Sequence, residues 1–346
     1  MTDSRNGTGR GRTDVENEIE ERIKQAMGEP KILTMNKKLI VEASTPGHNP
    51  SLLWERSGIV NMPPWTIEDQ AATIVECAKA GAAAIHTHPR DPSAKYNYDV
   101  SIAKAMAPEL AAQVFDKVYQ DVDIIPLGHA WHPKDWEDLA DADFITPTRE
   151  LLDIGKGNKY MQGNIIPTWI NPRSRKGLLS SWFNAKSLRE GIAYLEENNV
   201  KPLIGLHMHH FSWFKDNIMD AGVMKTRPHF NIAEGKHGVN TTFADPMSYL
   251  NLISDLELVK KVVPDCTIGL HAGGRNWLPM TVLGIMLGVD LVRVGIEDMF
   301  WSYPHKDEVI QKPSDSVEKI VQIARALGRE IATPAEARKI LGITVT

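Results

Sequence analysis

Cysteine is almost absent from this chain, which holds only Cys77 and Cys266 among 346 residues. The two lie far apart with no CxxC pair, which argues against a disulfide framework and against a thiolate zinc site. An excess of one charge is also lacking, since the formal net charge is −5. We therefore expect neither nucleic acid nor a membrane surface as a partner.

Long hydrophobic runs are missing as well, and none approaches the roughly 20 residues that a membrane span needs. The segment from Met1 to Gly28 is polar and has no apolar stretch of the kind found in signal peptides, so we expect a cytoplasmic protein. We divide the chain into a polar N-terminal extension, residues 1–30, and one domain over residues 31–346.

Within this domain, short apolar runs alternate with helical patterns. The expected strands are residues 39–43, 83–88, 124–128, 143–146, 202–207, 228–233, 267–272 and 291–295. Eight β-α units in a row predict a parallel sheet covered by helices, and closing it gives a (β/α)₈ TIM barrel. A doubly wound open sheet is the alternative, but no glycine-rich GxGxxG turn follows the first strand. Residues 153–184 are interpreted as a long insertion after strand four.

Two histidines at the end of the second expected strand, His86 and His88, indicate a metal site. Strand side chains alternate, so residues two apart point to the same face. Imidazole is a preferred ligand of zinc, copper and iron. The following Pro89 ends the strand, and active sites in parallel α/β proteins lie at these strand ends.

A third ligand is expected from the end of strand eight, where Glu297 and Asp298 follow an apolar run. Strands two and eight both neighbour strand one in a barrel, so Glu297 can face the histidine pair. Two histidines and a carboxylate with an open position suit catalytic zinc, and the same set also fits non-haem iron. Arg293, inside the apolar run, is the expected partner of these carboxylates.

Further histidines are expected around the same barrel mouth. His207 ends strand five and His209 follows two positions later. Both are interpreted as substrate-pocket residues, with metal ligation as the alternative. His129, after strand three, is interpreted as a loop or pocket residue.

Three ordered motifs resemble the β-keto acid cleavage enzymes. They are AGAAAIHTHPR at residues 80–90, RVGIED at residues 293–298 and LGREIATPAEAR at residues 327–338. The resemblance implies a TIM barrel, Zn²⁺, a homotetramer or another homo-oligomer, and a small β-keto acid that reacts with acetyl-CoA. The products would be acetoacetate and a new acyl-CoA.

The resemblance also implies roles for single residues. His86, His88 and Glu297 resemble the zinc ligands, Asp298 the catalytic base and Arg293 its partner. Thr146, placed after strand four, matches a threonine that contacts substrate. Gly205 stands where the type enzyme has a glutamate that suits an amino group on the substrate.

Two other functions remain open at this point. One is a zinc lyase or hydrolase that cleaves a C–C bond of a β-keto or β-hydroxy acid without CoA. The other is a non-catalytic barrel that binds a small acid or serves a structural role.

Overall fold

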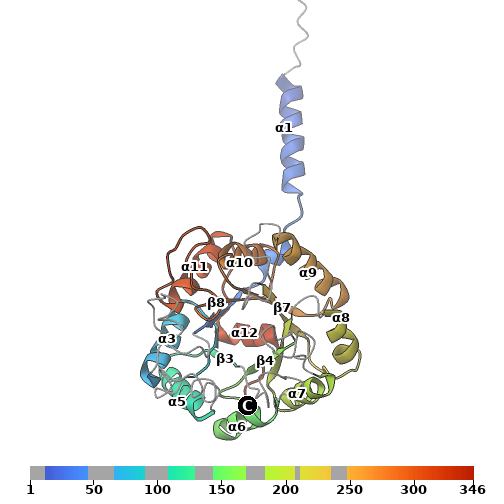
Figure 1. Ribbon diagram of the computed structural model, residues 1–346. Helices are drawn as coiled ribbons and strands as arrows, with labels where there is room; N and C mark the ends of the chain where they lie inside the picture. The colour runs from blue at the N-terminus through green and yellow to red at the C-terminus, as the bar shows by residue number, and fades with distance from the viewer. Residues whose placement is uncertain are drawn as a thin grey trace, which may run out of the picture.

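The structure is a computed structural model that describes residues 12–45, 66–89, 108–128, 143–168, 184–206, 211–234 and 248–346. Eight parallel strands close into a barrel in chain order, and β1 pairs with both β2 and β8. Figure 1 shows the strands at the centre of a ring of helices. The predicted TIM barrel is therefore confirmed. The strands are β1 (Ile40–Ser44), β2 (Ala84–His86), β3 (Ile125–Gly128), β4 (Gly163–Pro167), β5 (Lys201–Leu206), β6 (His229–Glu234), β7 (Thr267–Ala272) and β8 (Leu291–Gly295).

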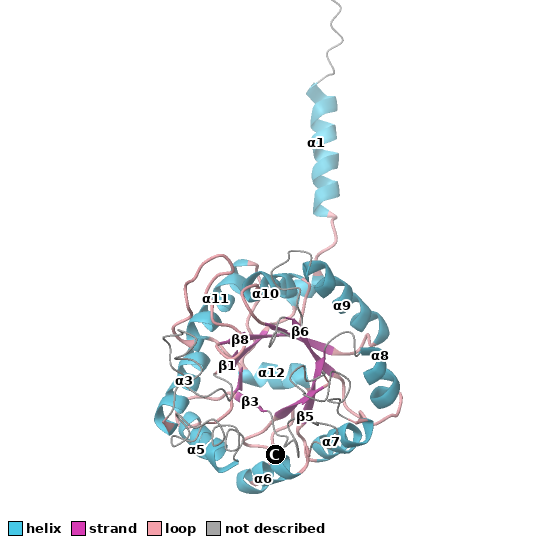
Figure 2. Cartoon of the chain, viewed as in Figure 1, coloured by secondary structure: helices cyan, strands magenta, loops and turns pink. Residues whose placement is uncertain are grey.

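Helices surround this barrel on its outside (Figure 2). They are α3 (Ile67–Ala80), α5 (Pro108–Val118), α6 (Thr146–Gly155), α7 (Ala185–Glu197), α8 (Phe211–Phe214), α9 (Ser248–Val262), α10 (Trp277–Met286) and α11 (Pro313–Ala326). A π-helical turn, η4 (Lys215–Met219), continues α8. Thr66 caps the start of α3, because its hydroxyl accepts a hydrogen bond from the Asp69 amide.

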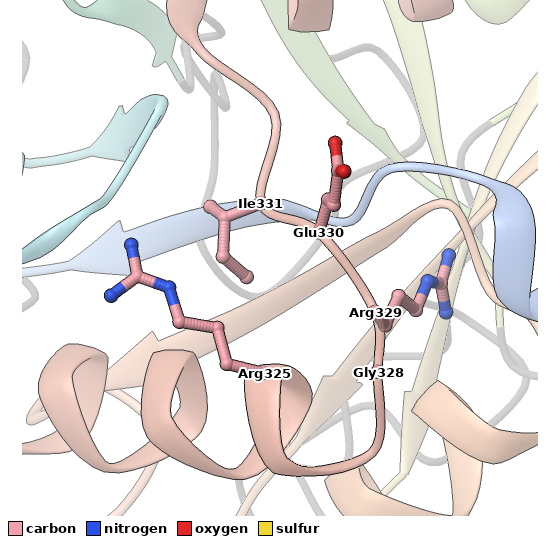
Figure 3. Close-up of a pocket in the computed structure, with 5 residues that line it drawn as sticks. All are labelled: Arg325, Gly328, Arg329, Glu330 and Ile331. Carbon is pink, nitrogen blue, oxygen red and sulfur yellow. The ribbon is translucent and has the colours of Figure 1, made fainter.

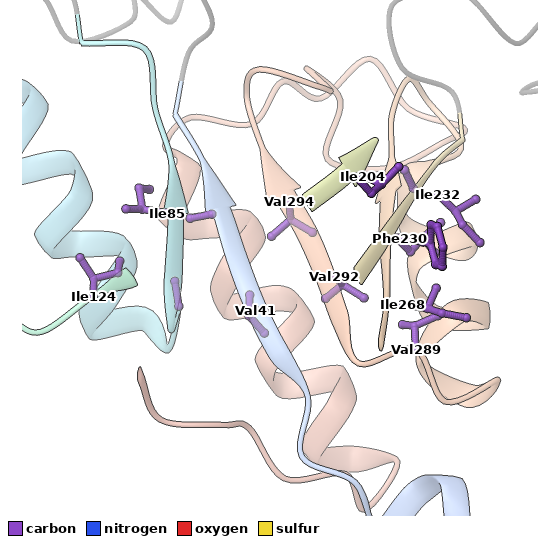
Figure 4. Packing of buried hydrophobic residues seen from close by; sticks show 14 of the residues in the cluster. Val41, Ile85, Ile124, Ile204, Phe230, Ile232, Ile268, Val289, Val292 and Val294 are labelled. Carbon is purple, nitrogen blue, oxygen red and sulfur yellow. The ribbon is translucent and has the colours of Figure 1, made fainter. Parts of the chain in front are cut away.

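Alternate strand residues supply two separate cores. Side chains such as Val41, Phe230 and Val292 pack between the sheet and the helices (Figure 4). Their neighbours Ile40 and Leu291 point into the barrel, where they pack in a second apolar cluster. This alternation decides which residues of each strand face the barrel interior. At the carboxyl ends of the strands, the interior-facing residues include the polar Ser44 and His86.

The last helix, α12 (Pro334–Leu341), closes the barrel at the end where the strands begin. Ala337 and Leu341 belong to the interior cluster, and Figure 2 shows α12 inside the ring of strands. A capping box starts this helix, since Thr333 and Glu336 exchange hydrogen bonds there.

Arg329 ties the link between α11 and α12 to the rest of this closed end. Its buried guanidinium donates to the carbonyls of Lys37, Ile285 and Val289. Arg325, Arg329 and Glu330 line a hollow of about 330 Å³. Figure 3 shows the side chains that line it. Because parallel strands begin here, this hollow lies at the opposite end of the barrel from His86 and Glu297.

The predicted position of strand four is wrong. Residues 143–146 form a turn in which Asp143 Oδ1 accepts from the Ile145 and Thr146 amides, and Thr146 then opens α6. The observed β4 starts at Gly163, where any Cβ would lie 2.9 Å from Leu127 and 3.1 Å from Leu203. Residues 153–167 therefore hold the end of α6 and β4 itself, so the predicted insertion does not begin at residue 153. Its part from 169 to 183 lies outside the described residues.

The N-terminal helix α1 (Arg12–Met27) stands away from the barrel (Figure 1). Its apolar residues form an exposed stripe with a spacing of four, made of Val15, Ile19, Ile23 and Met27. No helix in the described part of the chain combines the length and the apolar character that crossing a membrane requires. Both cysteines are free thiols inside the fold, as expected.

Candidate metal and catalytic centre

Strand β2 delivers two histidines to the open end of the barrel. His86 is its last residue and His88 follows two positions later, and their side chains are 1% and 4% exposed. The His86 Nδ1 atom lies 2.9 Å from the Leu127 carbonyl oxygen. A carbonyl can only accept, so Nδ1 carries the proton and Nε2 keeps its lone pair for a ligand.

Glu297 completes a cluster whose spacing suits a metal ion. The two Nε2 atoms lie 3.1 Å apart, and the Glu297 oxygens lie 3.4 Å from His86 Nε2 and 3.8 Å from His88 Nε2. Tetrahedral ligands at about 2.0–2.1 Å from zinc would be separated by about 3.3–3.4 Å. This trio is the one group of its kind found among the described residues. The distances between these ligand atoms therefore suit a metal ion bound by the three residues that the sequence predicts as ligands.

Arg293 connects this cluster to Asp298. Its Nη2 lies 2.9 Å from Glu297 Oε1, and its Nε donates to Asp298 Oδ2 at 2.8 Å. The guanidinium is 0% exposed. Burial alone would lower the pKa of Arg293, but the charges of Asp298, Glu297 and Glu42 outweigh it and raise that pKa. Arg293 is thus a permanent cation between a metal-ligand candidate and a base candidate.

Gly295 lets the end of β8 approach β1 closely enough to place these carboxylates. Its φ is +143°, and a Cβ there would lie 1.9 Å from the Ser44 carbonyl oxygen. The chain then turns, with the Asp298 amide bonding to the Gly295 carbonyl. Ser44 in turn donates its hydroxyl to Asp298 Oδ2 at 3.3 Å. The Asp298 side chain is 0% exposed, so its carboxylate is buried and held in place by Arg293 and Ser44.

Ser44, Glu42 and His271 are site residues for which sequence reasoning gave no role in this centre. Glu42 is 0% exposed, and its Oε2 lies 3.5 Å from His271 Nε2. A charged residue inside an apolar strand was the signal that singled out Arg293, and Glu42 gives the same signal within residues 39–43.

Other candidate residues have different outcomes. Thr146 is exposed and opens α6, the helix after β3, so its position after strand four is corrected. His129, His207 and His209 lie outside the described residues, so their pocket roles stay predictions.

Comparison with known proteins gives one family. The sequence profile of the beta-keto acid cleavage enzymes matches residues 56–343. The chain is 27% identical over 314 residues to a 3-keto-5-aminohexanoate cleavage enzyme of Acetoanaerobium sticklandii, which covers 89% of this chain and 99% of that one. It is 25% identical over 334 residues to a 3,5-dioxohexanoate:acetyl-CoA acetone transferase of Paraburkholderia graminis, with 89% and 97% covered.

Solved structures support the fold alone. The apo structure of ObcA matches with a TM-score of 0.61 at 14% sequence identity. The match covers 81% of this chain but 65% of ObcA.

Proposed function

Because the chain belongs to the beta-keto acid cleavage enzyme family, we propose that it is a zinc-dependent enzyme in which a β-keto acid reacts with acetyl-CoA. The products are acetoacetate and a new acyl-CoA. One observation carries this proposal: His86, His88 and Glu297 converge within metal-binding distance, and Arg293 links that cluster to Asp298. The acetyl-CoA transfer in the name of the Paraburkholderia relative supports the co-substrate.

The metal ligands in this proposal are His86, His88 and Glu297. Zinc bound there would act as a Lewis acid on the substrate carbonyl and so make enolate formation easier. Arg293 holds its positive charge beside the site, where it stabilises negative charge that develops on the substrate.

Asp298 takes the proton from C2 of the β-keto acid. The resulting enolate carbon attacks the acetyl-CoA carbonyl, and the CoA thiolate leaves. The thiolate then attacks the original ketone carbon and the C2–C3 bond breaks, which forms the new acyl-CoA. Asp298 returns its proton to C2 of the departing acetoacetate, so the base is regenerated. The bonds from Arg293 and Ser44 orient its carboxylate for both proton transfers.

The test is incubation of zinc-loaded protein with a panel of β-keto acids, with and without acetyl-CoA, followed by product analysis. We expect acetoacetate and a new acyl-CoA only when acetyl-CoA is present, and none from metal-free protein. Cleavage without acetyl-CoA would support a lyase or hydrolase instead. Binding of the acids without any turnover would support the non-catalytic barrel.

We also propose that the chain assembles into a homotetramer or another homo-oligomer, with α1 contributing to the contact. The exposed apolar stripe of α1 supports a partner helix. Antiparallel pairing with the α1 of a second copy would place Glu18 near Arg22 and Glu20 near Lys24, whereas parallel pairing would place like charges together.

The change Ile19→Ser with Ile23→Ser should lower the molar mass measured by light scattering after size exclusion. The matched control, Asn17→Ser with Glu21→Ser on the opposite face of α1, should leave the mass unchanged. Equal masses for both variants and the natural protein would contradict a role of α1 in assembly.

A further inference from the structure

Three consecutive strands, β7, β8 and β1, carry an ionisable residue at the same level of the barrel wall. Arg293 is in register with Glu42 on one side and with His271 on the other. The adjoining residues Val41 and Val292 pack in the outer core. Since strand side chains alternate, all three ionisable side chains start from the interior surface, with Arg293 in the middle.

The two outer residues of this row contact each other across the strand between them. Glu42 Oε2 lies 3.5 Å from His271 Nε2, although β8 separates β1 from β7. Strands two positions apart are separated by about 9–10 Å. Both side chains must therefore reach in front of the strand that carries Arg293. The guanidinium of Arg293 lies instead toward the strand end, where it binds Asp298 and Glu297.

Burying the Glu42 carboxylate at this position is unfavourable for the free energy of folding. It is 0% exposed, and within the described residues neither of its oxygens accepts a hydrogen bond. Arg293 Nη1 is likewise buried without a hydrogen-bond partner among those residues. A buried carboxylate without hydrogen bonds destabilises a fold, and an uncharged side chain of the same volume is often neutral or better. Stability therefore gives no reason for a charge at this position.

We propose that Glu42 and His271 form a buried pair that positions the Arg293 guanidinium against Asp298 and Glu297. The pair fills the space beside the arginine stem, and Glu42 attracts the guanidinium from below while the two carboxylates attract it from above. Neither residue of the pair touches the reacting atoms, so both are positioning residues. The proposal rests on the assignment of Asp298 as base under the proposed function.

The decisive variant is Glu42→Gln, which keeps the shape of the side chain and removes its charge. We expect kcat to fall about 10- to 100-fold, because small misplacements of catalytic groups have effects of that size. The KM for the β-keto acid should change less than about threefold, and zinc content should stay the same. A merely structural role predicts a lower melting temperature with kcat retained.

A double-mutant cycle tests whether the two residues act together. If they form one unit, Glu42→Gln combined with His271→Gln should lose no more kcat than the more severe single variant. Losses that multiply would overturn the pair. The matched control is Asp290→Asn, which also removes a buried carboxylate but at the closed end of the barrel, where Asp290 accepts from the Ile268 amide. It should leave kcat unchanged.

A readout without turnover separates this proposal from the proposed function. Glu297 receives Arg293 Nη2 at 2.9 Å, so a displaced arginine should alter the geometry of the metal ligands. Cobalt-loaded Glu42→Gln protein should therefore show a shifted visible absorption spectrum relative to the natural protein and to Asp290→Asn. A shift in a protein that lacks cleavage activity would refute the function and support the positioning role. An unchanged spectrum with unchanged kcat would overturn the positioning role.

Discussion

Replacing Asp298 by asparagine should remove turnover while the fold and the metal remain. The amide keeps the size of the carboxylate but cannot accept a proton from substrate. A positioned base contributes about 10²–10⁴-fold, so kcat should fall by that factor, which equals about 2.7–5.4 kcal/mol in the barrier. The measurement is the rate of acetoacetate formation at saturating β-keto acid and acetyl-CoA.

The structure also sets the stability cost of this change. Arg293 donates to both Asp298 oxygens, at 2.8 and 3.3 Å, and an amide can accept only one of these bonds. Hydrogen bonds to charged groups contribute about 1.5–3 kcal/mol each to stability. The free energy of unfolding should therefore fall by about 2 kcal/mol. The assay temperature must therefore lie well below the melting temperature of the variant, which calorimetry gives.

Asp290→Asn is the matched control for the loss of a buried carboxylate. Asp290 accepts the Ile268 amide at 2.9 Å and lies 3.7 Å from Lys37, far from the metal candidates. It should cost stability of a similar size but leave kcat within about twofold of the natural value. The reasoning is refuted if Asp298→Asn loses less than tenfold in kcat, or if both variants lose equally.

Three further predictions follow from the same geometry. The double variant His86→Ala/His88→Ala should lose its stoichiometric zinc, as measured by elemental analysis after dialysis, and full retention would place the metal elsewhere. Burial lowers the pKa of His229 to about 3; the unfolded chain therefore binds an extra proton below pH 6.5, and the free energy of unfolding should fall by about 2 kcal/mol between pH 7.5 and 5. Urea titrations at both pH values should show a smaller fall in His229→Gln, and an equal fall would refute this assignment. Because Gly205 offers no carboxylate to a substrate ammonium, kcat/KM should be lower for an amino-tailed β-keto acid than for uncharged or acidic ones of equal length. A preference for the amino substrate in that series would show that another carboxylate takes this role.

Periodicity gave the barrel from the sequence because seven of its eight strands are short apolar runs between helical patterns. The position of strand four was predicted wrongly because Gly163 and Pro167 are residue types typical of loops. Phe144 and Ile145, in contrast, form a short apolar run like that of a strand. Asp143 decides the outcome by bonding to two amides and starting a helical turn. A hydropathy pattern does not reveal such a hydrogen bond between a side chain and the backbone. The segment therefore forms a turn although its hydropathy pattern is that of a strand.

The convergence of His86, His88 and Glu297 could be predicted because strand order alone makes β2 and β8 the two neighbours of β1. The Glu42–His271 contact could not, since it joins strands that are not neighbours and depends on how far two side chains reach. Gly205 also gained its interpretation from the family resemblance rather than from any pattern in the strand. The sequence therefore predicts which strand ends lie close together. The contacts between side chains inside the barrel could be identified only in the three-dimensional structure.

The closure between the two ends of the chain has a consequence for synthesis on the ribosome. The Leu39 amide bonds to the Glu330 carbonyl, and Lys38 contacts Glu336, a residue 298 positions later. Translation proceeds at about 5–20 residues per second, so β8 is synthesised many seconds after β1, with which it pairs. Until then the edge of β1 that faces β8 stays unpaired, and the candidate metal ligands His86 and His88 lack Glu297. A nascent chain that stops before β8 would carry His86 and His88 without Glu297 and without the strand that closes the barrel.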